Sequence, residues 1–522
     1  MTMKQHYDLI IIGAGAGGGT LAYALAATGK NILILERGGY LPREKDNWNP
    51  DEIFLNQRYQ TQEKWLDRNQ EFFSPEAHYG VGGNTKLYGA ALQRMRAEDF
   101  GELQHYDGIS PAWPFPYEAF EPYYTRAESL FKIHGLRGED PTEPTASAEY
   151  PFPPLEHEPR IQEVADQLKD RGLNPFHITL AVDRNSQNPQ NSPCIRCATC
   201  DPYPCLINAK CDAQVTCIDP ALKHDNVTLQ INAEVTRLIT DSDGRTIKKV
   251  EAEIDGETQQ FTGDIVVVAC GAVNSAKLLL QSANDQHPNG LANSSGLVGR
   301  NLMLHNHSAL IAVSHQPNPT AFQKTLAITD YYFKGPEQDY PLGQIQLTGK
   351  AVWQRLKHMA DEEMPQPVLE YIAEHSVDFW VTNEDIPKYE NRVTVDSQGK
   401  ITVDFTRNNL KPHRELVSVL EQHLKQLDFY MFWTKQIPIN AVWHQAGTCV
   451  FGIDPQKSVL DINCRSHDIE NLYIVDASFF PSMGAVNPTL TIIANTLRVA
   501  DHLKETMGST QNLSSDSRLV TA

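Results

Sequence analysis

The N-terminal part of the chain places two apolar runs on either side of a glycine-rich turn. Residues 8–12 are almost entirely apolar, residues 32–35 form a second apolar run, and an alanine- and leucine-rich segment lies between them. Short continuous apolar runs are typical of parallel strands covered on both faces, and the intervening composition favours a helix. The pattern predicts a strand, a helix and a second strand, which together form a βαβ unit.

The turn after the first predicted strand has the spacing G-x-G-x-x-G, formed by Gly13, Gly15 and Gly18. In a dinucleotide-binding unit the first glycine makes a tight turn, the second lets the backbone approach a pyrophosphate, and the third lets helix and strand pack closely. Glu36 closes the second strand, where an acid accepts hydrogen bonds from a ribose hydroxyl. The stretch predicts binding of FAD or NAD and does not separate the two.

The C-terminal region carries a second set of polar residues at the ends of apolar runs. A histidine, His444, follows a tryptophan and precedes a Gly-Thr turn. Further on, residues 472–475 predict a strand that is followed by Asp476, a loop of small residues and Asn487-Pro488-Thr489. Asparagine, proline and threonine suit a helix start, so backbone N–H groups are expected to face a polar ligand there.

The central part of the chain is less regular. Residues 226–268 predict strands joined by an Asp-Ser-Asp-Gly turn, and residues 392–406 alternate apolar and polar positions like strands. Residues 413–433 predict an amphipathic helix, at whose end the aromatic residues are expected to belong to the core rather than to a substrate cavity: Phe429, Tyr430, Phe432 and Trp433. A proline- and acid-rich connector, residues 138–154, is expected to be a surface loop.

The net charge and the apolar content of the chain exclude some kinds of binding partner. The 522 residues carry a formal net charge of −20, which disfavours nucleic acid and anionic membranes as partners. No apolar run reaches the length of a membrane span, and the N-terminus lacks the pattern of a signal peptide, so a cytoplasmic location is expected.

Taken together, the two ends of the chain resemble the glucose–methanol–choline (GMC) oxidoreductases, which bind FAD. The resemblance also rests on "YGVGGNTKLYGAAL" (residues 79–92), "SPAWPFPYEAFEPYYTRAE", "DIVVVACGAVNSAKLLLQSA" and "GLVGRNLMLH". It implies an α/β (α+β overall) fold with a Rossmann-like FAD-binding domain and a discontinuous substrate domain, built on an antiparallel sheet plus helices. The implied FAD-binding pieces are residues 1–105, 190–310 and 440–508, the substrate-binding pieces are 106–189 and 311–439, and 509–522 form a loose tail.

The same resemblance implies roles for individual residues. His444 matches the base that takes the substrate hydroxyl proton, and Asn487, 43 residues later, matches its hydrogen-bonding partner. The implied cofactor contacts are Gly83 and Asn84 against the flavin, Val235, Gly271 and Ala272 near the adenine, Asp476 and Ala477 at the phosphates and ribityl chain, and Pro488 and Thr489 at the pyrimidine end of the flavin. Residues 84–88 contain no histidine or cysteine, so FAD is expected to be non-covalent.

The function implied is oxidation of an alcohol to a carbonyl by hydride transfer to FAD. A sugar, glycoside or polyol is the expected small-molecule substrate, and a dehydrogenase that uses an electron-acceptor protein or a quinone is favoured over an oxidase that uses O₂. A histidine with a reference pKa of about 6.5 is mostly neutral at pH 7 and can accept the proton. The alternatives are an oxidase acting on a non-sugar primary alcohol and a lyase in which FAD undergoes no redox change.

Six of the nine cysteines lie between Cys194 and Cys217. Cys194, Cys197, Cys200 and Cys205 have the spacing C-x₂-C-x₂-C-x₄-C, one residue longer than a ferredoxin-type run. The sequence leaves four hypotheses open: iron–sulfur ligands, a zinc site, disulfides, or free thiols.

Overall fold

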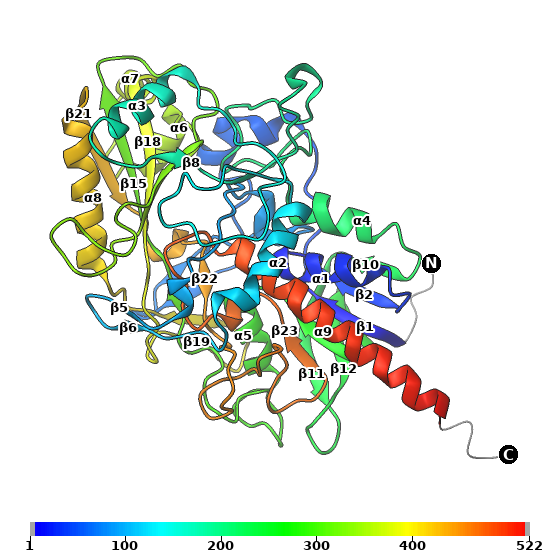
Figure 1. Ribbon diagram of the computed structural model, residues 1–522. Helices are drawn as coiled ribbons and strands as arrows, with labels where there is room; N and C mark the ends of the chain where they lie inside the picture. Colours follow the sequence, from blue (N-terminus) through cyan, green and yellow to red (C-terminus); the bar gives the residue numbers. More distant parts are fainter. Residues whose placement is uncertain (1–5, 517–522) are drawn as a thin grey trace.

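The computed structural model describes residues 6–516 and contains two large β-sheets, which lie on different sides of the molecule (Figure 1). The first sheet has the strand order β10-β2-β1-β13-β12-β11, with β23 beside β13. Its strands are β1 (His6–Ile12), β2 (Ile32–Leu35), β10 (Val227–Gln230), β11 (Ala233–Thr240), β12 (Ile247–Ile254), β13 (Glu257–Val268) and β23 (Leu472–Ile474). The predicted Rossmann-like arrangement of buried parallel strands is confirmed.

The register of this sheet determines where its polar residues gather. The central strands β10, β2, β1, β13 and β23 pair in parallel, and the register places Ile12 beside Leu35 and Val268. The carboxyl ends of these strands therefore meet at one edge of the sheet, where ligands bind in open α/β folds. Gly13 and Glu36 follow directly after β1 and β2 at this edge.

Helices from both ends of the chain pack on this sheet. Helix α1 (Ala16–Ala26) contacts α9 (Thr489–Asp516), and α2 (Tyr117–Leu130) packs on α9 in turn. Helix α9 continues to Asp516, so the tail predicted from residue 509 begins within a helix; residues 517–522 lie outside the described part. Within residues 6–516, no helix combines the length and the apolar character that crossing a lipid bilayer requires.

The second sheet is antiparallel, with the order β21-β15-β18-β17-β16-β8. Its strands are β8 (Phe176–His177), β15 (Asn306–Ser314), β16 (Leu326–Ile328), β17 (Gln344–Leu347), β18 (Ser376–Asn383) and β21 (Phe429–Gln436). Helices α3 (Pro159–Lys169) and α8 (Leu410–Lys425) bury apolar side chains against it, while α6 (Trp353–Met359) and α7 (Gln366–His375) pack beside each other. The predicted antiparallel sheet with helices is therefore present.

The aromatic run after α8 corrects one prediction. The helix predicted for residues 413–433 ends at Lys425, and the four aromatic residues lie on β21 instead. Pairing with β15 overrides the helical pattern, because aromatic residues favour a pleated surface next to a partner strand. Phe429 is 3% exposed and belongs to the core, whereas Tyr430 is 47% exposed. The expectation that all four form ordinary core is wrong.

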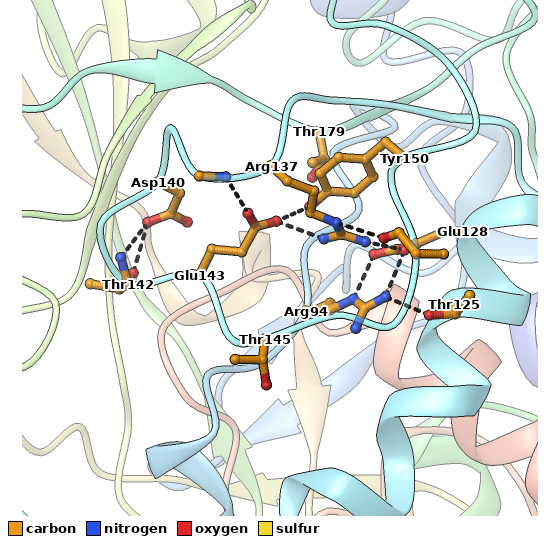
Figure 2. Close-up of polar contacts among 12 residues, drawn as sticks. Arg94, Thr125, Glu128, Arg137, Asp140, Thr142, Glu143, Thr145, Tyr150 and Thr179 are labelled. Carbon is orange, nitrogen blue, oxygen red and sulfur yellow. Dashed lines mark hydrogen bonds and ion pairs between the residues drawn. The ribbon is translucent and has the colours of Figure 1, made fainter.

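A network of buried charges anchors the connector of residues 138–154 (Figure 2). Glu128 of α2 accepts hydrogen bonds at 2.7 Å from Arg94 and at 2.6 Å from Arg137. Arg137 also pairs with Glu143 of the connector at 2.7 Å and lies over the ring of Tyr150. Because the Arg94 and Glu128 side chains are 1% and 2% exposed, these charges depend on one another for compensation. The connector is thus held firmly to α2.

We expect Glu128→Ala to lower the free energy of unfolding by about 2–4 kcal/mol, because Arg94 and Arg137 each lose one of two carboxylate partners and keep only Glu121 and Glu143. Urea denaturation followed by circular dichroism measures this change. Glu118→Ala, at an exposed position of the same helix, is the matched control and should change stability by less than about 0.5 kcal/mol. Equal effects of the two substitutions would contradict the role of Glu128.

Candidate active site

The turn after β1 carries the three glycines of the predicted motif, and steric limits require glycine at two of these positions, Gly13 and Gly18. Gly13 has a φ of +103°, and a Cβ there would lie 2.4 Å from the Ala269 carbonyl oxygen. A Cβ on Gly18 would lie 2.0 Å from the Gly13 carbonyl oxygen, so α1 can pack on the turn only with glycine at that position. A Cβ on Gly15 would meet nothing within 4 Å. The turn therefore leaves open backbone at Gly15 for a ligand to approach.

A cavity of about 260 Å³ begins at this turn and gathers almost all the predicted cofactor residues. The predicted residues that line it are Gly13, Gly15, Glu36, Gly83, Asn84, Val235, Gly271, Ala272, Asp476, Ala477, Pro488 and Thr489. Gly18 lies behind this surface, in the helix contact. Residues from both ends of the chain thus converge on one cavity, whose glycine cradle and polar ends suit a dinucleotide.

Backbone N–H groups hold the two acids of this cavity in place. Glu36 accepts hydrogen bonds from Ala14 N at 2.8 Å and Gly38 N at 3.1 Å. Burial raises the pKa of Glu36, against the opposing effect of these N–H groups. Asp476 accepts from Gly271 N at 3.0 Å and Ser478 N at 2.9 Å, which ties the end of β23 to the start of α5 (Ala272–Gln281). Both carboxylates therefore have fixed orientations.

Two cations at the Glu36 end of the cavity were not predicted. Arg37 pairs with Glu63 at 3.1 Å and with Glu234 at 3.3 Å, and its guanidinium lies 4.1 Å from the centre of the Tyr79 ring. Lys277 of α5 lies 3.7 Å from Glu234. Arg37, Glu234 and Lys277 line the cavity. Their only signal in the sequence was the position of Arg37 directly after Glu36.

A second cavity, of about 290 Å³, contains the predicted catalytic pair. His444 and Asn487 both line it, and His444 and Thr489 line the first cavity as well. Trp380 and Trp443 contribute aromatic surface. The predicted catalytic pair therefore lies where the two cavities adjoin, so a substrate in one could contact a cofactor in the other.

A chain of hydrogen bonds determines which nitrogen of His444 can accept a proton. His305 Nε2 lies 2.8 Å from the Gly484 carbonyl oxygen, which can only accept, so this nitrogen carries the hydrogen. Burial lowers the pKa of His305 to about 4, so the ring is neutral at pH 7 and its Nδ1 is an acceptor. His444 Nδ1, 2.9 Å away, must then donate. This leaves Nε2 of neutral His444 with a free lone pair.

The loop that supplies the Gly484 carbonyl is held by one buried acid, Glu384. Glu384 accepts from Met483 N at 3.2 Å and Gly484 N at 3.1 Å, and pairs with His105 at 3.0 Å. Burial alone would raise the pKa of Glu384, but the hydrogen bond from His105 lowers it on balance. Glu384 therefore carries a negative charge that fixes the peptide planes preceding Asn487.

His305 and His307 lie beside His444 in the candidate site, and sequence reasoning missed them. Within residues 6–516, ring nitrogens of His305, His307 and His444 form the one set of three metal-ligand side chains lying within 4.8 Å of one another. Burial lowers the pKa of His307 and of His444 well below the usual value, with neighbouring histidines adding to the effect. The signal available in the sequence was the alternation of His305 and His307 around Asn306 in an apolar run.

The cysteine-rich loop does not support the iron–sulfur prediction. All nine cysteines are free, and no set of three cysteine sulfurs in the described chain lies close enough to share a metal ion. A zinc site needs several thiolates around one ion. Burial instead raises the pKa of Cys194 to about 11, which favours the thiol form. The structure therefore fits the hypothesis of free thiols.

The sequence and the fold of this chain are similar to those of known flavoprotein oxidoreductases. Residues 7–307 and 387–496 match two family models described as GMC oxidoreductase. Paromamine 6'-oxidase of Streptomyces fradiae is 28% identical over 95% of this chain and 90% of its own length. The fructose dehydrogenase large subunit of Gluconobacter japonicus is 27% identical over 95% of this chain and 97% of its own length. Aspergillus oryzae formate oxidase, in a structure described as concerning FAD modification, superposes with a TM-score of 0.70 at 16% identity, over 98% and 100% of the two chains.

We expect the glycines of the turn to separate folding from cofactor binding. Gly18→Ala should destabilise the cofactor-free protein, because the added Cβ would overlap the Gly13 carbonyl oxygen. Gly15→Ala should leave that stability within about 1 kcal/mol of the wild type and weaken FAD binding about tenfold or more, because its Cβ would project into the cavity. Thermal unfolding without FAD and a fluorescence titration with FAD measure the two effects. A Gly15→Ala protein with unchanged FAD affinity would contradict this assignment.

Proposed function

The chain belongs to the GMC oxidoreductase family, and from that premise we propose that it oxidises the CH–OH group of an alcohol to a carbonyl with non-covalently bound FAD, using His444 as the base. The observation that carries the proposal is the position of His444, which lines both cavities and presents an unprotonated Nε2. Paromamine 6'-oxidase and fructose dehydrogenase, whose names describe oxidation of sugar-type compounds, support the reaction class.

The first cavity offers the groups that FAD needs. Gly13, Gly15 and the start of α1 would hold the pyrophosphate, and Glu36 would contact the adenine-side ribose. Pro488 and Thr489 at the start of α9 would contact the flavin end. When bound, FAD would supply the acceptor for the hydride. Since residues 84–88 contain no histidine or cysteine, we expect binding without a covalent bond through this loop.

The protein's own part is to orient the alcohol and remove its proton. His444 Nε2 would accept the hydroxyl proton, while the side-chain amide of Asn487 would hydrogen-bond the same oxygen and fix its orientation. As His444 gains the proton, its Nδ1–H continues to donate to His305, whose lone pair stabilises the positive charge. His305 in turn stays oriented by the Gly484 carbonyl.

A sugar, glycoside or polyol is the proposed substrate, supported by the names of the two relatives and by the mixture of aromatic and polar side chains in the second cavity. Relatives named oxidase and relatives named dehydrogenase show similar identity to this chain. The rates of flavin reoxidation by O₂ and by quinones identify the electron acceptor.

We expect His444→Ala to retain FAD and to slow flavin reduction by substrate about 10²- to 10⁴-fold, the usual contribution of a general base. Anaerobic stopped-flow absorbance with a panel of sugars and polyols measures the rate of flavin bleaching. The exposed His224 provides a control, because His224→Ala should behave as the wild type. Failure of every alcohol to bleach the wild-type flavin would favour the lyase alternative, and an unchanged rate in His444→Ala would refute the assigned base.

We expect the rate of flavin reduction to stay level from pH 8 down to about pH 6.5 and to fall only at lower pH. Burial places the pKa of His444 well below 6.5, so the unprotonated base prevails at every pH above that lowered value. A pH profile of the anaerobic reduction rate at saturating substrate tests this. A midpoint at or above pH 6.5 on the acid side would contradict a neutral, desolvated His444.

A further inference from the structure

Asp201, Lys324 and Arg355 bring three charged side chains to the wall of the second cavity. Asp201 Oδ2 accepts hydrogen bonds from Thr348 Oγ1 at 3.1 Å and Gly349 N at 3.3 Å. Lys324 is 3% exposed and donates to the Gly89 carbonyl oxygen. These side chains come from separate segments, so the cluster exists only in the folded protein.

Shared hydrogen-bond partners connect Asp201 and Arg355 of this cluster to each other and not to the histidines of the second cavity. Arg355 Nη1 donates to Thr348 Oγ1 at 3.2 Å and to the Gly349 carbonyl at 3.2 Å, next to the groups that bind Asp201. A Cβ on Gly89 would lie 3.2 Å from Asp201 Oδ2 and 3.3 Å from Lys324 Nζ, which brings the carboxylate and the ammonium to the same small region. The bonds of His444 and His307 run instead to His305 and Thr382.

The position of Asp201 depends on the cysteine-rich loop. Lys210 Nζ donates at 2.8 Å to the carbonyl oxygens of Tyr203 and Tyr88, which joins this loop to the cavity wall. Burial alone would raise the pKa of Asp201, but Lys324, Arg355 and Lys210 lower it on balance. The loop therefore presents an ionised carboxylate to the cavity.

The mixture of charges indicates the chemical class of ligand. A carboxylate accepts hydrogen bonds from hydroxyl groups, and an ammonium and a guanidinium donate to hydroxyl or ring oxygens. Charges of both signs lie side by side, so a carboxylate attracted by Lys324 and Arg355 would also be repelled by Asp201, and an ammonium attracted by Asp201 would also be repelled by the two cations. A neutral compound with several adjacent hydroxyls satisfies all three groups, and Trp380 and Trp443 offer aromatic surface to its C–H faces.

We propose that Asp201, Lys324 and Arg355 form a subsite that binds the non-reacting hydroxyl groups of a neutral polyhydroxylated substrate while another hydroxyl is presented to His444. This inference rests on the proposed function and makes it more specific, because it names the groups that distinguish a sugar or polyol from a simple alcohol. The three residues determine specificity and do not take part in the chemical step.

The test is a binding measurement on the FAD-loaded His444→Ala protein, which removes turnover. Isothermal titration calorimetry compares methyl β-D-glucopyranoside with tetrahydropyran-2-methanol, which keeps the ring and the primary hydroxyl but lacks the other hydroxyls. We expect the glucoside to bind more tightly. Adding Asp201→Asn should weaken glucoside binding about tenfold or more, because a charge-assisted acceptor is lost, and should change binding of tetrahydropyran-2-methanol by less than about twofold.

Two further variants sharpen the result. Arg355→Gln should give the same selective loss, and Asp361→Asn, which alters an exposed acid, should leave both affinities unchanged. Equal losses for the two ligands, no loss for the glucoside, or no detectable glucoside binding would each overturn the subsite. Tighter binding of glucosamine or gluconate than of the neutral glucoside would overturn the assigned ligand class. Failure of the proposed function is seen separately, as absence of flavin bleaching in the wild-type protein.

Discussion

The hydrogen bond from His305 Nε2 to the Gly484 carbonyl determines the protonation pattern on which the proposed chemistry depends. It sets the tautomer of His305, which in turn sets the tautomer of His444 and leaves Nε2 free to accept a proton. The carbonyl has a fixed direction because the N–H of the same peptide group, Ala485 N, donates to the Tyr332 hydroxyl at 2.8 Å. Glu384 fixes the two preceding peptide groups by accepting from the N–H groups of Met483 and Gly484. Burial contributes by keeping both rings neutral. The fold thus leaves Nε2 of the proposed base unprotonated before any substrate binds.

Much of the fold and of the cofactor cavity could be predicted from the sequence, because local rules govern these parts. The strand, glycine turn and second strand follow from continuous apolar runs and from steric demands at Gly13 and Gly18. The exception is β21, where pairing with β15 overrides the helical pattern before it. A single-sequence pattern contains no information on which distant strand will be available as a partner.

The residues that sequence reasoning missed depend on distant contacts. The roles of His305 and Glu384 come from their position against the loop that precedes Asn487, which no spacing reveals. The cysteine-rich loop shows the converse. Its spacing suggested a metal site, yet within residues 6–516 no three of its sulfurs lie close enough to bind one metal ion. What this loop brings to the second cavity is Asp201. The cysteines of this loop drew attention to metal binding, but only the tertiary structure shows that Asp201 lines the cavity.

The tautomer of His444 can be observed directly by ¹⁵N NMR of the FAD-bound protein labelled at its histidine side chains, with His444→Ala used to assign the signals. At pH 7 we expect His444 to be neutral, with the hydrogen on Nδ1 and an unprotonated Nε2. A cationic ring, or a neutral ring with the hydrogen on Nε2, would show that the hydrogen bonds of His305 do not prepare His444 as the base.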